Sequence, residues 1–169
     1  YLPVSAGTLL LGVIRGFKHL LASKMIESIP RIVGCQTRQV SPLYHRLKNL
    51  SYKPPKTVDS IADALVSVDP PLLESMVKNM KEVNGDAAIV EEEEIIGAFK
   101  ELAGKGFYVE PSSAVAYAGY KKHVGDGEAS KDSKVVIVLT GTGLKTQFVP
   151  EQRWFFKSHV QNLSSCTSF

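Results

Sequence analysis

The stretch KVVIVLTGTGLK, residues 134–145, joins an apolar, β-branched run to a loop of threonines, glycines and one lysine. Continuous Val and Ile residues are typical of a strand buried on both faces of a parallel sheet. Glycines suit the turn that must follow such a strand. A turn alone does not require a hydroxyl at the strand tip, where open α/β sheets bind their ligands. The stretch therefore predicts a strand over 134–140 that carries Thr140 to a ligand.

The rest of the chain alternates short apolar runs with segments whose apolar residues recur at helical spacing. We expect strands over 2–4, 31–36 and 86–90, and helices over 8–24, 42–49 (capped by Ser41), 72–85, 91–106 and 111–124. Residues 59–71 fit either a short helix or a turn, and residues 106–110 fit a brief extended piece. This alternation predicts an α/β fold: a three-layer, mostly parallel sheet with helices on both faces.

A second candidate site follows the first expected strand, at Ser5, Ala6, Gly7 and Thr8. Small side chains let backbone N–H groups approach an anion at a helix start, where the helix dipole favours negative charge. A phosphate is the natural ligand, although a tight strand-to-helix turn would use the same residues. The loop lacks both the Gly-Lys-Ser/Thr ending of a P-loop and the GxGxxG pattern, so we expect neither ATP, GTP nor a dinucleotide.

The composition is that of an ordinary globular domain: 169 residues, 44% hydrophobic and 22% charged, with a net charge of +3. The basic residues are scattered and do not alternate with aromatic ones, so we expect no nucleic-acid partner. The apolar start is too short and too interrupted for a membrane span or signal peptide, so we expect a cytoplasmic protein without membrane contact. Cys35 and Cys166 are far apart and the histidines stand singly, so we expect no metal site. Residues 91–94, EEEE, complement a helix N-terminus.

Five stretches occur in the order expected of threonine synthase: PVSAGTLLLGVIRGFKHL, PRIVGCQ, SIADAL, GFYVEPSSAVAYAGYKK and VVIVLTGTGLK. Over residues 2–146 the chain thus resembles this family of fold-type II pyridoxal-phosphate enzymes, which is related to tryptophan synthase β and to serine/threonine dehydratases. The resemblance implies a tryptophan synthase β-like fold, of which this chain would form a part, and pyridoxal 5'-phosphate as the cofactor. It also implies conversion of O-phosphohomoserine and water to threonine and phosphate.

The resemblance assigns cofactor contacts to both loops. In the family the threonine of the TGxGLK loop faces the pyridine nitrogen of the cofactor, and that residue here is Thr140. A neutral hydroxyl there would leave the nitrogen unprotonated and temper the electron withdrawal of the ring. The family's phosphate loop falls on Ser5, Ala6, Gly7, Thr8 and Leu9. The family commonly has Gly-Asn at the first two of these positions.

The family's Schiff-base lysine, in a Phe-Lys-Asp-type motif, has no match here, so we predict no catalytic residue in this chain. Lys145 is near the site, but its place five residues after Thr140 puts it on the wrong side of the ring. We therefore expect residues 1–146 to form the cofactor-cradling, C-terminal part of a longer homodimeric enzyme, inactive without its N-terminal half. The aromatic tail, 147–169, would pack on the core or on an interface.

Two other interpretations stay open. A threonine/serine dehydratase of the same fold would differ in the amino acid that it accepts. A non-catalytic α/β module would also lack the Schiff-base lysine and carry an altered phosphate loop. A longer gene with an upstream lysine would favour an enzyme over such a module.

Overall fold

The computed structural model describes residues 1–130 and 132–146 of the chain, and the predicted packing of the aromatic tail lies outside them. Within the described residues the strands run parallel in the order β1-β2-β3, with bounds β1 Leu2–Pro3, β2 Val33–Thr37 and β3 Asp86–Val90. In the register, Leu2 pairs with Gly34 and Val33 pairs with Asp86. The carboxyl ends of the strands therefore share one edge of the sheet.

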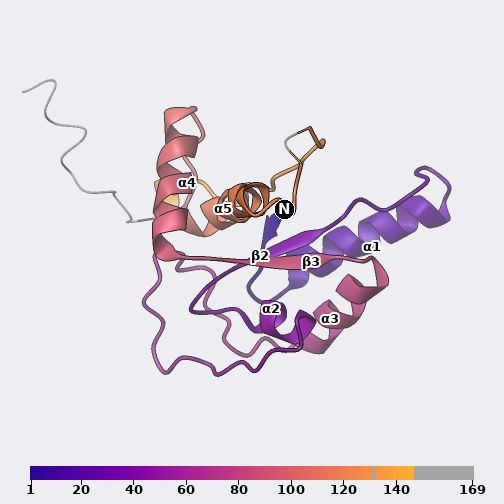
Figure 1. Cartoon of the computed structure of the whole chain (residues 1–169), viewed down its shortest axis with the longest axis horizontal. Helices are drawn as coiled ribbons and strands as arrows, with labels where there is room; N and C mark the ends of the chain where they lie inside the picture. Colours follow the sequence, from indigo (N-terminus) through magenta and orange to yellow (C-terminus); the bar gives the residue numbers. More distant parts are fainter. Residues whose placement is uncertain (131, 147–169) are drawn as a thin grey trace, which may run out of the picture.

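Helices cover both faces of this sheet, which confirms the predicted three-layer α/β fold (Figure 1). The helices have the bounds α1 Thr8–Ala22, α2 Pro42–Leu47, α3 Leu73–Glu82, α4 Glu92–Gly104 and α5 Pro111–Gly125, and a short 3-10 turn, η1, covers Gly143–Lys145. Helices α4 and α5 lie on one face, and α1, α2 and α3 lie on the other. The predicted helices over these five segments are confirmed.

The sheet separates two apolar clusters because successive strand residues point to opposite faces. In β2, a side chain built on Gly34 would meet Leu43 of α2 at 3.1 Å, whereas Cys35 lies against Gly119 of α5. The α5 cluster includes Val33, Cys35, Ala88, Val90, Ile95, Phe99, Ala114 and Val115. The opposite cluster includes Leu2, Val4, Leu10, Ile14, Leu43, Met76 and Met80. Packing on both faces holds the strand ends, and the loops that leave them, in place.

The predicted strand over 134–140 is wrong as a regular strand. Residues 134–138 are extended, and the backbone nitrogen of Tyr1 donates to the oxygen of Val136 at 2.9 Å. The nitrogen of Val138 in turn donates to the oxygen of Tyr1, also at 2.9 Å. This is the bonding of a parallel ladder around one residue. The ladder stops because the next residue of β1 that faces this segment is Pro3, which has no N–H to donate.

The predicted cap of α2 is also wrong in its chemistry. Ser41 occupies the N-cap position, but its hydroxyl donates to the oxygen of Arg38 at 3.3 Å and caps no helical N–H. Instead, the Oε1 atom of Gln36 accepts from the N–H of Tyr44 at 3.0 Å. Gln36 is wholly buried in β2, so the neighbouring strand supplies the cap.

Two further segments adopt no regular structure. Residues 59–71 form turns and bends rather than a short helix. Gly106, at a φ of 88°, lies in a turn, and residues 107–110 form no strand apart from a single antiparallel bridge between Val109 and Thr142, so the predicted extended piece is not a regular strand. In the described part of the chain, no helix combines the length and the apolar character needed to cross a membrane.

Candidate functional site

The turn between β1 and α1 requires a glycine at its last position, residue 7. Gly7 has a φ of 98°, in the left-handed region that glycine enters without steric cost. A Cβ built on Gly7 would also lie 2.3 Å from the sulfur of Met76, which is wholly buried in α3. Backbone conformation and packing therefore fix this turn independently of each other.

The start of α1 leaves backbone donors without acceptors. The first helical bond runs from the N–H of Leu11 to the oxygen of Gly7 at 3.0 Å. The N–H groups of residues 8–10 thus have no helical acceptor, and no partner among the described residues. No side chain caps this end, no acidic residue lies in its first turn, and Ala6 and Thr8 are exposed. Such a helix start can bind an anion.

The start of α4 shows the opposite arrangement. The N–H of Glu91 donates to the carboxylate of Glu94 at 2.7 Å, and the Glu91 side chain reciprocates in a capping box. These glutamates already complement the helix dipole, which confirms the prediction for residues 91–94. An added anion would meet like charges at α4, whereas it meets none in the first turn of α1.

The loop that begins at Thr140 leaves the sheet beside this turn. The hydrogen bonds of Tyr1 with Val136 and Val138 place the extended segment directly next to β1. Ser5 and Thr140 therefore follow neighbouring parallel segments at the carboxyl edge, where open α/β sheets bind ligands. Thr140 is exposed there and Ser5 is half-buried. The structure thus brings the two predicted loops together.

The start of α5 and the residues before it hold this second loop. The N–H of Glu110 donates to the oxygen of Gly141, and the N–H of Gly143 donates to the oxygen of Tyr108, both at 3.0 Å. A Cβ built on Gly141 would lie 2.2 Å from the Glu110 carboxylate, and one built on Gly143 would lie 2.7 Å from the Tyr108 ring. A side chain at either glycine of the GTG sequence would therefore have to displace the Glu110 carboxylate or the Tyr108 ring.

Lys145 ends this loop and pairs with Glu110. Its Nζ lies 3.1 Å from Oε2 of Glu110, whose side chain is 8% exposed while that of Lys145 is 60% exposed. A buried carboxylate needs a cation or hydrogen-bond donors, because an isolated buried charge is costly. The lysine therefore anchors the loop.

Sequence reasoning assigned neither Glu110 nor Ser113 to the site. Ser113 is wholly buried, and its hydroxyl oxygen accepts from the N–H of Thr140 at 2.8 Å. The signal was present in VEPSSA, since polar side chains at the start of a buried helix must find partners. The sequence could not say which groups those partners are.

A cavity of about 420 Å³ lies at the other end of the sheet, where Tyr1, Phe17 and Ile32 are among its lining residues. These residues lie at or before the amino ends of the strands, or on α1. Ligands of open α/β sheets bind at the carboxyl ends. We therefore do not assign this cavity to the predicted site.

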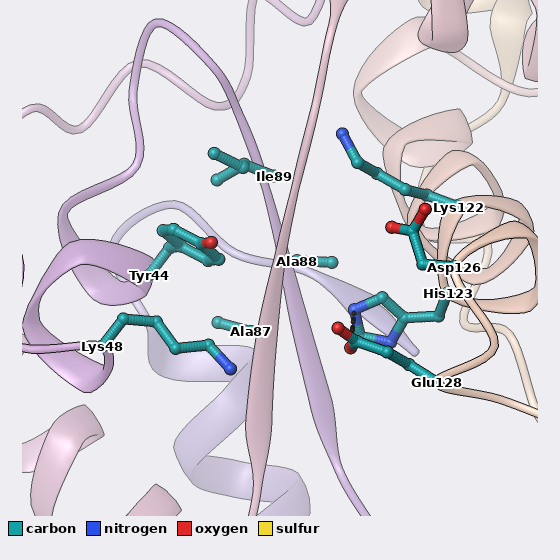
Figure 2. A pocket seen from close by; sticks show the side chains of 9 residues that line it. All are labelled: Tyr44, Lys48, Ala87, Ala88, Ile89, Lys122, His123, Asp126 and Glu128. Atoms are coloured by element: carbon teal, nitrogen blue, oxygen red, sulfur yellow. Dashed lines mark ion pairs between the residues drawn. The ribbon is translucent and has the colours of Figure 1, made fainter.

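A smaller hollow of about 80 Å³ opens on the outer edge of β3 (Figure 2). Short side chains of β3 form its middle, with Lys48 on one side and Lys122 on the other. The Nζ of Lys48 lies 2.8 Å from the carboxylate of Asp86. The Nζ of Lys122 lies 3.5 Å from that of Glu94. Because both cations are paired, this hollow lacks a free positive charge for a phosphate.

Thiol and metal chemistry find no support in the described part of the chain. Burial raises the pKa of the Cys35 thiol to about 12, so the thiol stays protonated and is a poor nucleophile at neutral pH. No group of three His, Cys, Asp or Glu residues among those described is arranged to hold a metal ion.

Residues 1–141 match the family model described as pyridoxal-phosphate dependent enzyme. The chain belongs to this family. The predicted cofactor, pyridoxal phosphate, is thereby confirmed at the level of the family. The two loops at the carboxyl edge fit the group, because an uncapped helix start can take its phosphate and an exposed hydroxyl lies on the neighbouring loop.

Threonine synthases are similar in sequence to this chain. That of Methanocaldococcus jannaschii is 32% identical over 149 residues, which cover 85% of this chain and 36% of the relative. That of Halalkalibacterium halodurans is 34% identical over 132 residues, which cover 78% of this chain and 35% of the relative. The predicted resemblance to threonine synthase is confirmed, and the chain spans little more than a third of the length of these relatives.

Solved structures with the same fold include two threonine deaminases. Isoform 2 from Solanum lycopersicum has a TM-score of 0.66 at 22% identity, over 83% of this chain and 38% of that one. A second threonine deaminase, that of T.th., has a TM-score of 0.62 at 20% identity, over 88% of this chain and 50% of that one. These likenesses concern the fold alone. They confirm the predicted tryptophan synthase β-like fold, of which this chain forms a part.

Proposed function

We propose that this chain is the cofactor-binding part of a threonine synthase, which converts O-phosphohomoserine and water to threonine and phosphate. One observation carries the proposal: the uncapped start of α1 and the Thr140 loop leave neighbouring segments at one edge of the sheet. The named relatives support this choice of reaction, since threonine synthases are 32% and 34% identical to the chain.

Each loop has one task in this proposal. The backbone N–H groups of residues 5–9 bind the cofactor phosphate, helped by the dipole of α1. The hydroxyl of Thr140 is the neutral partner of the ring nitrogen. Pyridoxal phosphate, when bound, supplies a ring that withdraws electrons from the amino acid. A hydroxyl stabilises a protonated ring nitrogen less than a carboxylate would, so Thr140 moderates that withdrawal.

The lysine that binds the cofactor covalently belongs, in this proposal, to the rest of the enzyme. The chain covers only 36% of the M. jannaschii relative, which leaves most of such an enzyme outside it. Within the described loops, Lys145 is already engaged with Glu110. We therefore expect no activity from these 169 residues alone.

A threonine dehydratase of the same fold is the second candidate. The fold is compatible with this reaction, because the two threonine deaminases share it with TM-scores of 0.66 and 0.62. A dehydratase would act on an amino acid that carries a hydroxyl, whereas a threonine synthase needs room for a second phosphate. The two candidates therefore differ in a property that substrates can report.

The test uses the full-length gene product, purified with pyridoxal phosphate and offered each substrate separately. We expect O-phosphohomoserine to yield inorganic phosphate and threonine in equal amounts, and threonine to yield no 2-oxobutyrate. The reverse pattern would establish the dehydratase. Neither product, with the cofactor still bound, would indicate the non-catalytic module.

Thr140→Val tests the assigned ring partner. We expect kcat to fall about tenfold or more while the unfolding midpoint changes little, because the exposed Thr140 loses one hydrogen bond to the cofactor. Thr142→Val is the matched control, since the Thr142 hydroxyl accepts from Leu144 within the loop, at 3.3 Å. Equal losses of kcat in both variants would argue against a specific role of Thr140.

A further inference from the structure

The position of Thr140 is not set by the sheet. The ladder between β1 and the extended segment ends with the bond from Val138 to Tyr1, because Pro3 has no N–H to continue it. Beyond Val138, no hydrogen bond among the described residues joins this segment to β1. Another group must therefore hold the backbone at the point where the candidate cofactor loop begins.

That group is the hydroxyl of Ser113. Its Oγ accepts from the N–H of Thr140 at 2.8 Å, and this is the hydrogen bond that the described structure gives Thr140. Ser113 is 0% exposed. Its own N–H donates to the oxygen of Glu110 at 3.0 Å in the first turn of α5. The anchor is thus a buried side chain on a rigid element, while the residue that it holds is exposed.

The rest of the loop has its own attachments. Gly141 and Gly143 bond through their backbones to residues 108–110, and Lys145 pairs with Glu110. These contacts do not involve the Ser113 hydroxyl. Loss of that hydroxyl should therefore leave the loop attached and free only its first residue, which is Thr140.

We propose that Ser113 is the positioning residue for Thr140: its buried hydroxyl holds the Thr140 backbone, so that the Thr140 side chain meets the cofactor. This role rests on the proposed function, in which Thr140 contacts the ring nitrogen. Ser113 acts through Thr140 and does not touch the cofactor itself. A residue that acts in this way should lose its effect on the cofactor once the Thr140 hydroxyl is gone.

The neighbouring residue Ser112 provides a matched control. It lies in the same turn of α5 and is 2% exposed. Its hydroxyl accepts from the N–H of Ala64 at 3.0 Å and donates to Asp63 at 3.3 Å. Ser112→Ala thus removes an equally buried hydroxyl that also accepts from a backbone N–H, but from a different loop.

The first measurement is amide hydrogen exchange of the full-length protein, followed in peptides that cover residues 61–66 and 138–146. We expect Ser113→Ala to speed exchange at Thr140 about tenfold, as loss of one hydrogen bond predicts, and to leave residues 61–66 unchanged. Ser112→Ala should do the reverse. Unchanged exchange at Thr140 in Ser113→Ala would show that Ser113 does not anchor it.

The second measurement is the affinity for pyridoxal phosphate in a double-mutant cycle of Ser113→Ala and Thr140→Val. We expect each single change to weaken binding about five- to tenfold, and the double variant to bind no more weakly than Thr140→Val. Independent, multiplied losses would overturn the positioning role, because they would mean that Ser113 acts without Thr140. If the wild-type protein bound no pyridoxal phosphate, the proposed function would fall and the cofactor role of Ser113 with it. The exchange data would still decide whether Ser113 anchors the loop.

Discussion

Gly119 of α5 packs directly against Cys35 of β2. A Cβ built on Gly119 would lie 2.5 Å from the Cys35 sulfur and 3.5 Å from the Cβ of Ala88. Both Gly119 and Cys35 are buried. The helix thus lies so close to the sheet that the Cys35 thiol fits between them only because residue 119 has no side chain.

Gly119→Ala should destabilise the protein by about 1–3 kcal/mol, because the added methyl overpacks a buried contact. In a Cys35→Ala background the same change should cost about 1–2 kcal/mol less, since the space held by the thiol has been vacated. Urea unfolding of the four proteins measures this coupling.

Gly97→Ala is the control for helix propensity. Gly97 lies in α4, and a Cβ built there would meet nothing within 4 Å. We expect it to be neutral or stabilising by up to about 1 kcal/mol in both backgrounds. Strict additivity of Gly119→Ala and Cys35→Ala would contradict the direct contact.

Gly7→Ala tests the turn at the candidate phosphate site. The change places a side chain at a φ of 98° and drives a methyl into buried Met76, so we expect a loss of about 2–4 kcal/mol in the free energy of unfolding. Gly16→Ala, at an exposed position of α1 with open space around it, should instead stabilise the protein by about 0.5–1 kcal/mol. Urea denaturation of the two variants decides the matter, and equal effects would refute the assigned turn geometry.

His123 should make stability depend on pH below neutrality. Burial lowers the pKa of its imidazole below 6.5, with Arg31 and Lys48 adding to this, although the carboxylates of Glu128 and Asp86 oppose it. The unfolded chain then binds a proton near pH 6.5 that the folded protein rejects. The contribution of neutral His123 to the free energy of unfolding is therefore fully present above pH 6.5. It is lost as the pH falls through the pKa of the folded state.

The variant His123→Gln should flatten the slope of unfolding free energy against pH below pH 6.5. The slope is the relevant readout because loss of the 3.1 Å contact between Nδ1 and the Tyr1 hydroxyl lowers stability at every pH. Glu128→Gln removes the carboxylate 3.3 Å from Nε2 and should extend the loss of stability to lower pH. An unchanged slope in His123→Gln would assign the pH dependence to other groups.

Much of the fold follows from local sequence. The apolar runs of β2 and β3 and the helical spacing in α1 and α3 report burial directly, because each element must hide one or both faces. The run at residues 134–138 is equally apolar but forms no regular strand, since a ladder also depends on the neighbouring backbone. Pro3, far away in sequence, ends that ladder.

The sequence predicted where the two loops of the candidate site begin, but not which side chains hold them. Small residues at 5–7 and the hydroxyl at Thr140 mark strand ends, and parallel topology brings such ends together. The contacts of Ser113 and Glu110 were not predictable, because a buried polar side chain reveals a need for a partner and not the partner itself. Gln36 illustrates the same limit, since it caps a helix that Ser41 was expected to cap.

Lys145 should not form the covalent link to the cofactor. Its Nζ lies 3.1 Å from the Glu110 carboxylate, and its side chain is 60% exposed. A lysine that forms a Schiff base needs a desolvated amine aimed at the carbonyl carbon, whereas this amine is held by a carboxylate and exposed to water. When the 169-residue chain is mixed with pyridoxal phosphate and reduced with borohydride, we expect no preferential labelling of Lys145 by peptide mass mapping. Lys145→Arg, which keeps the charge opposite Glu110, should preserve cofactor affinity in the full-length protein, whereas Lys145→Met should weaken it. A single adduct at Lys145, abolished in Lys145→Arg, would instead make this chain the carrier of the covalent lysine.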